Sequence, residues 1–268
     1  MKVCIIGLGQ IGGSLALALR KNKKFVYGIS RNKDTIDYAV SKGIISDGSS
    51  DINLKNFDKE NFDIIFLAVH LGLYEHYIKK LKGFGGILSD VGSVKRVFYR
   101  LSKQNGFRFV GCHPIAGTQM SGIESADSNL FLDKYCIISG WSDENSKDVI
   151  SNLWKEVGAK ISFMSPKNHD KFVSAISHLP HIIAFSIVNS TYSIRKNNSG
   201  IFGGSFKDII RVAESPAEMW ADIFLYNSDF VVKQTEKQLA EMKKLIHMIK
   251  NKQRNKILKY ILKTKQKI

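Results

Sequence analysis

Two stretches of the chain carry side chains that could transfer a proton or bind an anion. His113 follows an apolar run over residues 107–112, and an imidazole that titrates near neutral pH can act as a general base. The alternative is a histidine satisfied by local hydrogen bonds. Arg211 ends the segment 206–211, where its guanidinium could fork onto a substrate carboxylate. The alternative there is a surface ion pair with Asp208, which would contribute little to stability.

A pair of histidines lies between these two stretches. His178 and His181 fall in a helical pattern at a spacing of three residues, so they share roughly one helix face. Two histidines could ligate a metal, but no third ligand lies nearby and the H-E-x-x-H arrangement is lacking, so we predict no metal site. Pro180, between them, should kink the helix because proline cannot donate a backbone hydrogen bond.

The N-terminal stretch contains a glycine pattern that suits a phosphate group. Residues 3–6 are an apolar run, residues 7–12 read G-L-G-Q-I-G, and apolar residues follow at helical spacing. In this context the first glycine permits a tight turn, the second lets the backbone approach a pyrophosphate, and the third lets helix and strand pack closely. The intact flanks favour a cofactor site over a simple tight turn, with the helix dipole facing the phosphates. The residues assigned to this site are Gly7, Gly9, Gln10, Ile11 and Gly12.

The end of the next apolar run, residues 25–29, bears on which dinucleotide binds. A carboxylate at this position holds the ribose hydroxyls of NAD and repels the 2′-phosphate of NADP. Ser30 and Arg31 stand there instead, and a hydroxyl beside a guanidinium suits a phosphate. The sequence therefore favours NADP. NAD is the alternative, in which Arg31 stacks on the adenine or is solvated.

These groups need a scaffold that brings them together. Apolar runs alternate with helical segments along the first part of the chain, which is typical of an α/β, doubly wound and mostly parallel sheet of the Rossmann type. Such sheets bind ligands at the carboxyl ends of their strands, where the glycine turn, Val69, Ser93 and His113 all fall. The predicted strands cover residues 3–6, 25–29, 63–69, 86–91, 107–112, 134–139 and 160–164.

The pattern changes after Pro166. Residues 1–165 form the predicted dinucleotide-binding domain, and residues 166–268 read as helical almost without interruption. The helices of this second domain carry apolar residues on more faces than one short segment can cover. That favours a homodimer in which the two copies share a helical domain.

Composition restricts the class of protein. A hydrophobic content of 44% with 24% charged residues is typical of a globular protein, and no apolar run approaches the ~18–20 residues of a membrane span. Met1 leads directly into the first strand, which leaves no room for a signal peptide. The three cysteines lie in apolar runs, at a spacing that fits neither a disulfide framework nor a metal site. We therefore expect reduced thiols in a cytoplasmic protein without a membrane partner.

The net charge of +16 raises nucleic acid as a partner. Residues 243–268 hold ten Lys and Arg and no Asp or Glu, while their apolar residues recur at helical spacing. This distribution favours an amphipathic helix with a solvated, lysine-rich face. Binding of nucleic acid or of another acidic partner is the less favoured interpretation.

Five segments, in this order, resemble the prephenate/arogenate dehydrogenase family of tyrosine biosynthesis. With S-P (215–216) and M-W (219–220) they extend the resemblance over nearly the whole chain. The segments G-C-H-P-I-A-G-T (111–118) and S-H-L-P-H (177–181) are far more specific than the glycine pattern. The segments are G-L-G-Q-I-G-G (7–13), D-V-G-S-V-K (90–95), G-C-H-P-I-A-G-T (111–118), S-H-L-P-H (177–181) and F-K-D-I-I-R (206–211).

The resemblance implies an NAD(P)-dependent oxidative decarboxylation in a homodimer. A hydride leaves C4 of the substrate ring for the nicotinamide, CO₂ departs, and the ring becomes aromatic. Prephenate would give 4-hydroxyphenylpyruvate, and arogenate would give tyrosine. The resemblance also implies the roles of residues: His113 takes the proton of the C4 hydroxyl, Ser93 contacts that hydroxyl and the nicotinamide, and Arg211 binds a substrate carboxylate. Substrate-binding positions are completed by Thr118, Gln119, His178 and His181, and cofactor-binding positions by Ser93 and Val69.

Two departures from the family pattern bear on specificity. Gln119 stands where relatives can carry an acid, and a neutral side chain does not favour the ammonium group of arogenate, so prephenate is favoured. His70 stands where the family more often has a small polar residue and a proline, and we assign it no role.

Three rival functions remain. Arogenate dehydrogenase uses the same scaffold. A β-hydroxyacid dehydrogenase would place a catalytic lysine on a helix of the second domain, and no convincing equivalent is present. A Rossmann binding protein with a basic tail would bind nucleic acid in a salt-sensitive way, but gives no reason for the positions of His113, His181 and Arg211.

Overall fold

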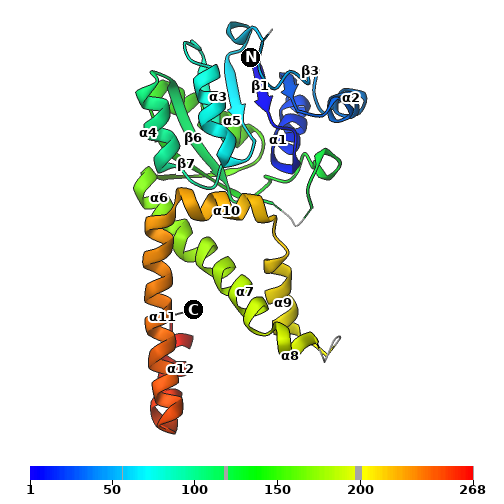
Figure 1. The fold of residues 1–268 in the computed structure, drawn as a ribbon. Helices are drawn as coiled ribbons and strands as arrows, with labels where there is room; N and C mark the ends of the chain where they lie inside the picture. Colours follow the sequence, from blue (N-terminus) through cyan, green and yellow to red (C-terminus); the bar gives the residue numbers. More distant parts are fainter. Residues whose placement is uncertain (56, 118–119, 197–200, 268) are drawn as a thin grey trace. The chain divides into compact units, whose positions relative to one another are not determined.

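The computed structural model describes residues 1–55, 57–117, 120–196 and 201–267 (Figure 1). They form two compact units. The first combines Met1–Val173 with Glu214–Tyr226, and the second combines Ser174–Ala213 with Asn227–Ile268. The predicted division of the sequence after residue 165 differs slightly from these compact units and stays a prediction.

An eight-stranded sheet forms the centre of the first unit, in the order β3-β2-β1-β4-β5-β6-β7-β8. All neighbours are parallel except β6 and β7, which are antiparallel. The strand order reverses beside β1, which makes the crevice between β1 and β4 the place where a doubly wound sheet binds a dinucleotide. The strands are β1 (Lys2–Ile6), β2 (Phe25–Ile29), β3 (Asp47–Ser49), β4 (Ile64–Leu67), β5 (Ile87–Asp90), β6 (Arg108–Pro114), β7 (Tyr135–Trp141) and β8 (Lys160–Met164).

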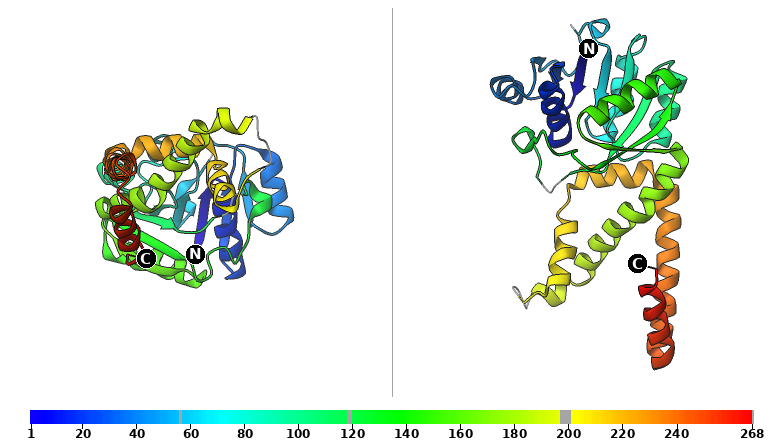
Figure 2. Two further views of the ribbon diagram at one scale, coloured as in Figure 1. Left: turned by 90° about the horizontal axis from the view of Figure 1, so that it is seen from below. Right: turned by 180° about the vertical axis from the view of Figure 1, so that it is seen from behind.

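Helices cover both faces of this sheet (Figures 1 and 2). The helices of this unit are α1 (Gln10–Lys21), α2 (Lys33–Ser41), α3 (Tyr74–Lys80), α4 (Arg96–Gln104), α5 (Glu144–Glu156), α6 (Pro166–Val173) and α10 (Ala217–Tyr226), with short 3₁₀ turns η1 (Lys59–Asn61), η2 (Leu71–Leu73) and η3 (Ile123–Ser125). Of these, α10 lies across one end of the sheet and not on a face (Figure 1). The prediction of an α/β doubly wound domain is confirmed.

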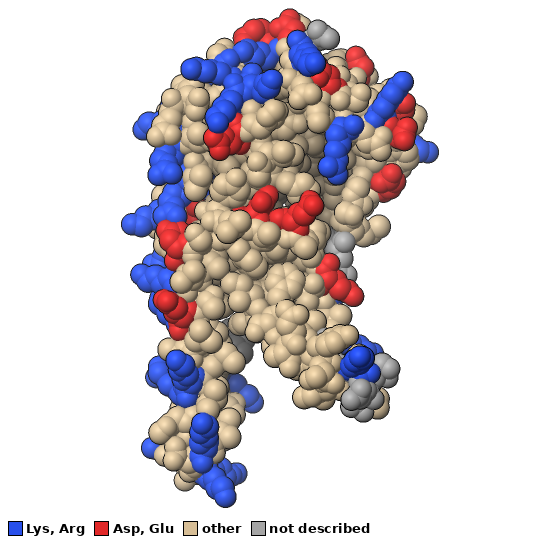
Figure 3. Space-filling view, in the orientation of Figure 1, with Lys and Arg blue, Asp and Glu red and all other residues tan. Residues whose placement is uncertain are grey.

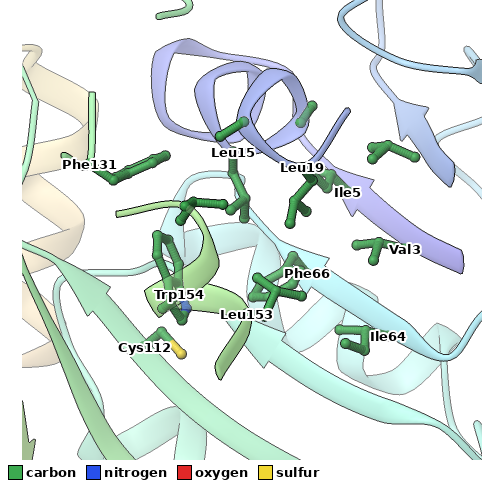
Figure 4. Packing of buried hydrophobic residues seen from close by; sticks show 14 of the residues in the cluster. Val3, Ile5, Leu15, Leu19, Ile64, Phe66, Cys112, Phe131, Leu153 and Trp154 are labelled. Atoms are coloured by element: carbon green, nitrogen blue, oxygen red, sulfur yellow. The ribbon is translucent and has the colours of Figure 1, made fainter. Parts of the chain in front are cut away.

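The core on one face explains why the strands read as continuous apolar runs. Side chains alternate between the two faces of a strand, and parallel strands are buried on both. Val3 and Ile5 of β1 face the same way as Ile64 and Phe66, their register partners on β4. Leu15 and Leu19 of α1 and Leu153 and Trp154 of α5 pack on this face (Figure 4).

The opposite face positions the loops that follow β4 and β5. Tyr74 of α3 is buried, donates a hydrogen bond from its hydroxyl to the carbonyl of Leu67 at 3.1 Å, and packs on Phe98 of α4 with 4.7 Å between ring centroids. Helix α10 contacts this layer, because Tyr226 packs on Phe98 with 5.0 Å between centroids. Asp222 of α10 also accepts a hydrogen bond from the backbone N–H of Gly72, at 2.9 Å, just after β4.

The described part of the second unit is helical, as predicted. Its elements are a π-helical turn η4 (Ser174–His178), α7 (Leu179–Ser190), α8 (Tyr192–Lys196), α9 (Gly204–Ala213), α11 (Ser228–Lys250) and α12 (Arg254–Lys265). Pro180 is the second residue of α7, directly after the wider π turn, so the missing N–H falls where the helical hydrogen-bond pattern already changes. The helical path is therefore irregular at Pro180, as the proline predicts, without being interrupted.

The basic C-terminal tail is two helices rather than the one amphipathic helix expected from its spacing. The chain turns at Asn251–Gln253, where Lys252 has φ of 51°. Helix α12 folds back along α11, and the Tyr260 hydroxyl donates to Glu241 Oε2 at 3.1 Å. The solvated lysine face is as expected: Lys and Arg side chains are prominent on these helices (Figure 3).

One helical stretch has the length and composition of a membrane span. Residues Pro166–Ser190 form 25 continuous helical residues, which the sequence-based expectation overlooked because it considered apolar runs and not helices. Helices that pack in the core or interface of a globular protein pass the same test, so the stretch is weak evidence for a membrane. The absence of a membrane partner stays a prediction.

Candidate active site

The glycine turn between β1 and α1 has the geometry that a pyrophosphate needs. Gly7 has φ of +106°, and a Cβ on Gly12 would lie 2.0 Å from the carbonyl oxygen of Gly7, so neither position accepts a side chain. Among the residues that the structure describes, a Cβ on Gly9 would meet nothing within 4 Å. Packing within the described structure therefore does not require a glycine at position 9. The space beside it fits the approach of a phosphate. Gly9 is also the N-cap of α1 and provides no side-chain cap, so the turn suits an anion from outside.

The ends of β2 and β4 flank this turn. Ser30 is half-buried and Arg31 is exposed directly after β2, as a contact with the ribose of a dinucleotide requires. After β4, Val69 is half-buried and lies against the turn, because a Cβ on Gly7 would be 2.9 Å from its Cγ1. His70 is exposed at the start of η2. The residues present thus fit a dinucleotide at the switch point of the sheet.

The end of β5 carries a buried ion pair that the sequence did not reveal. Asp90 is wholly buried and pairs with the ammonium group of Lys95, whose side chain is 1% exposed. Asp90 also accepts backbone hydrogen bonds from Gly92 at 3.0 Å and from Cys112 at 3.1 Å. Burial raises the pKa of Asp90, and the Lys95 ammonium and these N–H groups oppose that shift. The loop that contains half-buried Ser93 is thereby fixed at both ends.

His113 lies near the end of β6, one residue beyond the run predicted as a strand. Its side chain points away from the α1/α5 core, because the preceding residue, Cys112, belongs to that core. His113 Nδ1 lies 2.8 Å from Nε2 of His169 on α6. His169 Nδ1 in turn lies 2.8 Å from Oδ1 of Asp170. The half-buried His113 is thus hydrogen-bonded to His169 and through it to Asp170, both of which are 0% exposed.

Asp170 links these two histidines to the loop after β5. Its Oδ1 accepts from the backbone N–H of Lys95 at 2.8 Å, and its Oδ2 accepts from that of Arg96 at 2.9 Å. These N–H groups begin α4 and would otherwise lack helical partners. The structure therefore brings Ser93 and His113 onto two adjoining strand ends, as predicted, and supplies a common support for both.

The two histidines of the second unit have different environments. His178 is 1% exposed, and its Nδ1 lies 3.2 Å from Nδ2 of Asn227, which is also buried. His181 is half-buried, and its Nδ1 donates to the carbonyl of Ser177 at 2.9 Å, which leaves Nε2 as its acceptor nitrogen when neutral. Burial lowers the pKa of His181, although the Ser177 carbonyl opposes this. His181 is therefore suited to meet a ligand as a neutral ring, whereas His178 is held within its own unit.

Arg211 forms the ion pair that the sequence offered as one alternative. Its Nε lies 3.7 Å from Oδ1 of Asp208 on the same helix, and the two side chains are 59% and 76% exposed. An exposed pair of this kind is worth little to stability, so it is weakly held and can exchange partners. Thr118 and Gln119 lie outside the described residues. Within the described part of the chain, no group of three or more His, Cys, Asp or Glu is placed to hold a metal ion.

Two family models match this chain over most of its length. Residues 15–163 match the prephenate dehydrogenase nucleotide-binding domain, and residues 165–263 match the prephenate dehydrogenase dimerization domain. The chain belongs to the prephenate dehydrogenase family. The prephenate dehydrogenase of Bacillus subtilis is 30% identical over 272 residues, which cover 96% of this chain and 72% of that protein.

Solved structures of family members have the same fold. Prephenate dehydrogenase from A. aeolicus, in complex with hydroxyphenyl propionate and NAD⁺, superposes with a TM-score of 0.91 at 33% identity, covering 100% of this chain and 96% of that one. Synechocystis arogenate dehydrogenase superposes with a TM-score of 0.80 at 28% identity, covering 94% and 93%. The predicted family, fold class and class of enzyme, an NAD(P)-dependent dehydrogenase, are confirmed.

Site residues that sequence reasoning missed in this family member are Asp90, Lys95, His169 and Asp170. The first two lie at the ends of a predicted motif, D-V-G-S-V-K, whose charged residues could have been read as partners. His169 and Asp170 lie in a polar segment just after Pro166, and no spacing in the sequence relates them to His113.

Proposed function

We propose that the protein catalyses the NAD(P)-dependent oxidative decarboxylation of prephenate to 4-hydroxyphenylpyruvate. The observation that carries this proposal is the position of His113. It stands at the end of β6, next to the Ser93 loop, in a sheet whose switch point carries the nucleotide turn. Family membership and the likeness to prephenate dehydrogenases support the choice of substrate.

The dinucleotide would be held by the glycine turn, by Ser30 and Arg31 after β2, and by Val69 after β4. When bound, its nicotinamide ring accepts a hydride from C4 of the substrate. The chain orients the ring against the substrate and keeps the phosphates on the N-terminus of α1. The remaining chemistry for the protein is to remove one proton, because formation of the aromatic ring supplies much of the driving force.

His113 takes that proton from the C4 hydroxyl as a general base. Its Nδ1 lies 2.8 Å from His169 Nε2, so we assign the contact with the substrate hydroxyl to Nε2. Ser93, on the neighbouring loop, contacts the same hydroxyl and the nicotinamide end. A positioned base of this kind contributes a rate factor of about 10²–10⁴.

We assign substrate recognition to further polar residues. Arg211 binds a substrate carboxylate, exchanging its exposed contact with Asp208 for a charge-assisted one. His181 presents a neutral Nε2 to the substrate, and His178, hydrogen-bonded to Asn227, supports the same helical segment. Thr118 and Gln119 remain predicted substrate contacts.

We propose NADP as the preferred cofactor, with NAD also accepted. The exposed guanidinium of Arg31 and the hydroxyl of Ser30 can both contact a 2′-phosphate. Neither Ser30 nor Arg31 is acidic, so neither would repel the 2′-phosphate as a carboxylate would.

Arogenate is the second candidate substrate. It is favoured by the similarity to Synechocystis arogenate dehydrogenase, and opposed by the neutral Gln119. The two substrates differ in one side-chain group, an ammonium in place of a ketone, so the same base and cofactor serve both.

We further propose a homodimer located in the cytoplasm. The dimerization-domain match covers the helical region, and α11 and α12 have large apolar side chains that are exposed in the single chain. A partner copy would remove them from water. These residues are Val232, Leu239, Met242, Ile246, Ile249, Leu258, Ile261 and Leu262.

Identification of the product tests the activity. Purified protein is incubated with prephenate or arogenate and a dinucleotide, and the products are separated by chromatography and weighed by mass spectrometry. We expect 4-hydroxyphenylpyruvate from prephenate, in step with reduced dinucleotide. Tyrosine from arogenate at a much higher rate would transfer the assignment to arogenate, and no product from either would refute it.

A further inference from the structure

The hydrogen-bonded chain from Asp170 to His113 has a direction, and that direction decides which nitrogen of His113 accepts a proton. Backbone N–H groups can only donate. Asp170 therefore accepts at both oxygens, at Oδ1 from Lys95 and at Oδ2 from Arg96. His169 Nδ1 lies 2.8 Å from the same Oδ1. Because that oxygen is an acceptor, His169 Nδ1 carries the hydrogen.

The neutral state of His169 sets the next bond. Burial is the largest influence on the pKa of His169 and lowers it; nearby Lys95 lowers it further, while Asp170 and Asp90 act in the opposite sense. A neutral ring with its hydrogen on Nδ1 has a lone pair on Nε2. That Nε2 lies 2.8 Å from His113 Nδ1, so His113 Nδ1 is the donor. His113 Nε2 is then the nitrogen with the lone pair.

We infer that His169 and Asp170 are positioning residues that hold His113 in the tautomer with hydrogen on Nδ1 and the lone pair on Nε2. The inference rests on the proposed function, in which His113 is the general base. Without His169, the ring of His113 could rotate and place its hydrogen on either nitrogen. With it, one tautomer and one ring plane are selected before the substrate binds, as in other sites where a buried carboxylate orients a catalytic imidazole.

The same carboxylate also supports the other predicted catalytic residue. Asp170 holds the backbone of Lys95 and Arg96, two and three residues after Ser93. Lys95 pairs with Asp90, and Asp90 accepts from the backbone N–H of Cys112, next to His113. The buried groups thus connect the two anchors of His113: His169, which is hydrogen-bonded to its ring, and Asp90, which accepts from the backbone N–H of the preceding residue.

The tautomers can be measured directly, without any assay of activity. We would label the seven histidines of the chain with ¹⁵N and record long-range ¹H–¹⁵N correlation spectra of the intact protein, with His113→Asn and His169→Gln to assign the signals. Near neutral pH, we expect both His113 and His169 to carry a hydrogen on Nδ1 and none on Nε2. A hydrogen on Nε2 of His113, or a mixture of tautomers, would overturn the inference.

Kinetics of two substitutions at one position provide the second test. His169→Leu removes both ring nitrogens, and we expect kcat to fall by about 10- to 100-fold, less than the ~10²–10⁴-fold attributed to the base itself. His169→Gln keeps a carbonyl that can accept from His113 Nδ1 and should recover part of that loss. Dinucleotide affinity should be unchanged in both, and the acid limb of the kcat–pH profile should move in His169→Leu.

The matched control is His76→Gln, because His76 is exposed on α3, outside the proposed site. It should behave as the unsubstituted protein. A folded His169→Leu protein with unaltered kcat and pH profile would overturn the positioning role while leaving the proposed function intact. If the spectra show the predicted tautomers but the protein is inactive on both prephenate and arogenate, the positioning of His113 by His169 is supported and the proposed reaction is refuted.

Discussion

Replacement of His113 by asparagine separates the role of this residue as a base from its role in the structure. The Nδ2 group of asparagine lies close to where Nδ1 of histidine lies. It can therefore still donate to His169 Nε2, across the bond that is 2.8 Å long in the structure. What asparagine lacks is the second ring nitrogen. The substitution thus removes the proposed base and preserves the buried hydrogen-bonded chain.

The expected loss follows from the chemistry of proton removal. A positioned general base contributes a factor of about 10²–10⁴, so His113→Asn should raise the activation free energy by about 2.7–5.5 kcal/mol. The loss should appear in kcat and kcat/KM together, because the base acts in the transition state. Dinucleotide affinity should not change, since the glycine turn is on a different strand. Thermal stability should change little, because the bond to His169 is kept.

The assay is the initial rate of dinucleotide reduction, with dinucleotide affinity and thermal unfolding measured on the same preparations. His76→Asn, at an exposed position on α3, is the matched control and should have unaltered kinetics. Turnover of His113→Asn within a few-fold of the unsubstituted protein would refute the assignment of the base. An equal loss in the control would show that the assay reports damage to the fold.

Four further predictions follow from the same structure. Arg31→Ala should raise KM for NADP more than KM for NAD in steady-state kinetics, since only NADP has the 2′-phosphate; equal effects would contradict this contact. Arg211→Ala should raise the substrate KM by about 10- to 100-fold, from the roughly 1.5–3 kcal/mol of a charge-assisted bond, and a pure kcat effect would contradict a binding role. Gly12→Ala places a Cβ 2.0 Å from the Gly7 carbonyl oxygen, so it should destabilise the fold by about 1–3 kcal/mol in denaturant unfolding and weaken dinucleotide binding; an unchanged protein would contradict the packing. Burial lowers the pKa of His169 from 6.5, so below that pH the unfolded chain binds a proton that the folded chain does not; stability should therefore fall as pH drops below 6.5, less so in His169→Gln, and identical pH profiles would refute this.

The sequence could predict the sheet because parallel strands that are buried on both faces are apolar throughout. Residues 3–6 and 63–69 are such runs, and β1 and β4 fall within or beside them. Strand β3, Asp47–Ser49, was not predicted, because it is three residues long, polar, and at the edge of the sheet. A strand of that kind is defined by its neighbour and not by its own composition.

The site could be predicted only in part, for a related reason. The end of a strand can be recognised from the local sequence, so Ser93 and His113 could be predicted to lie at the carboxyl ends of neighbouring strands. The support beneath them depends on tertiary contacts: His169 lies 56 residues from His113 along the chain, and Asp170 lies 75 residues from Lys95. Neither contact leaves a periodic signal in the sequence. The turn between α11 and α12 was missed because residues 250–256 contain neither glycine nor proline, the residues that most clearly mark a break in a helix.

The most direct test of the central claim is the initial rate of dinucleotide reduction with the purified protein, followed by the absorbance of the reduced nicotinamide. Prephenate and arogenate are each combined with NAD⁺ and with NADP⁺. We predict rapid reduction with prephenate, fastest with NADP⁺, and slower reduction with arogenate. No reduction in any mixture, by a folded protein that still binds the dinucleotide, would contradict the proposed reaction and leave only the fold and the family.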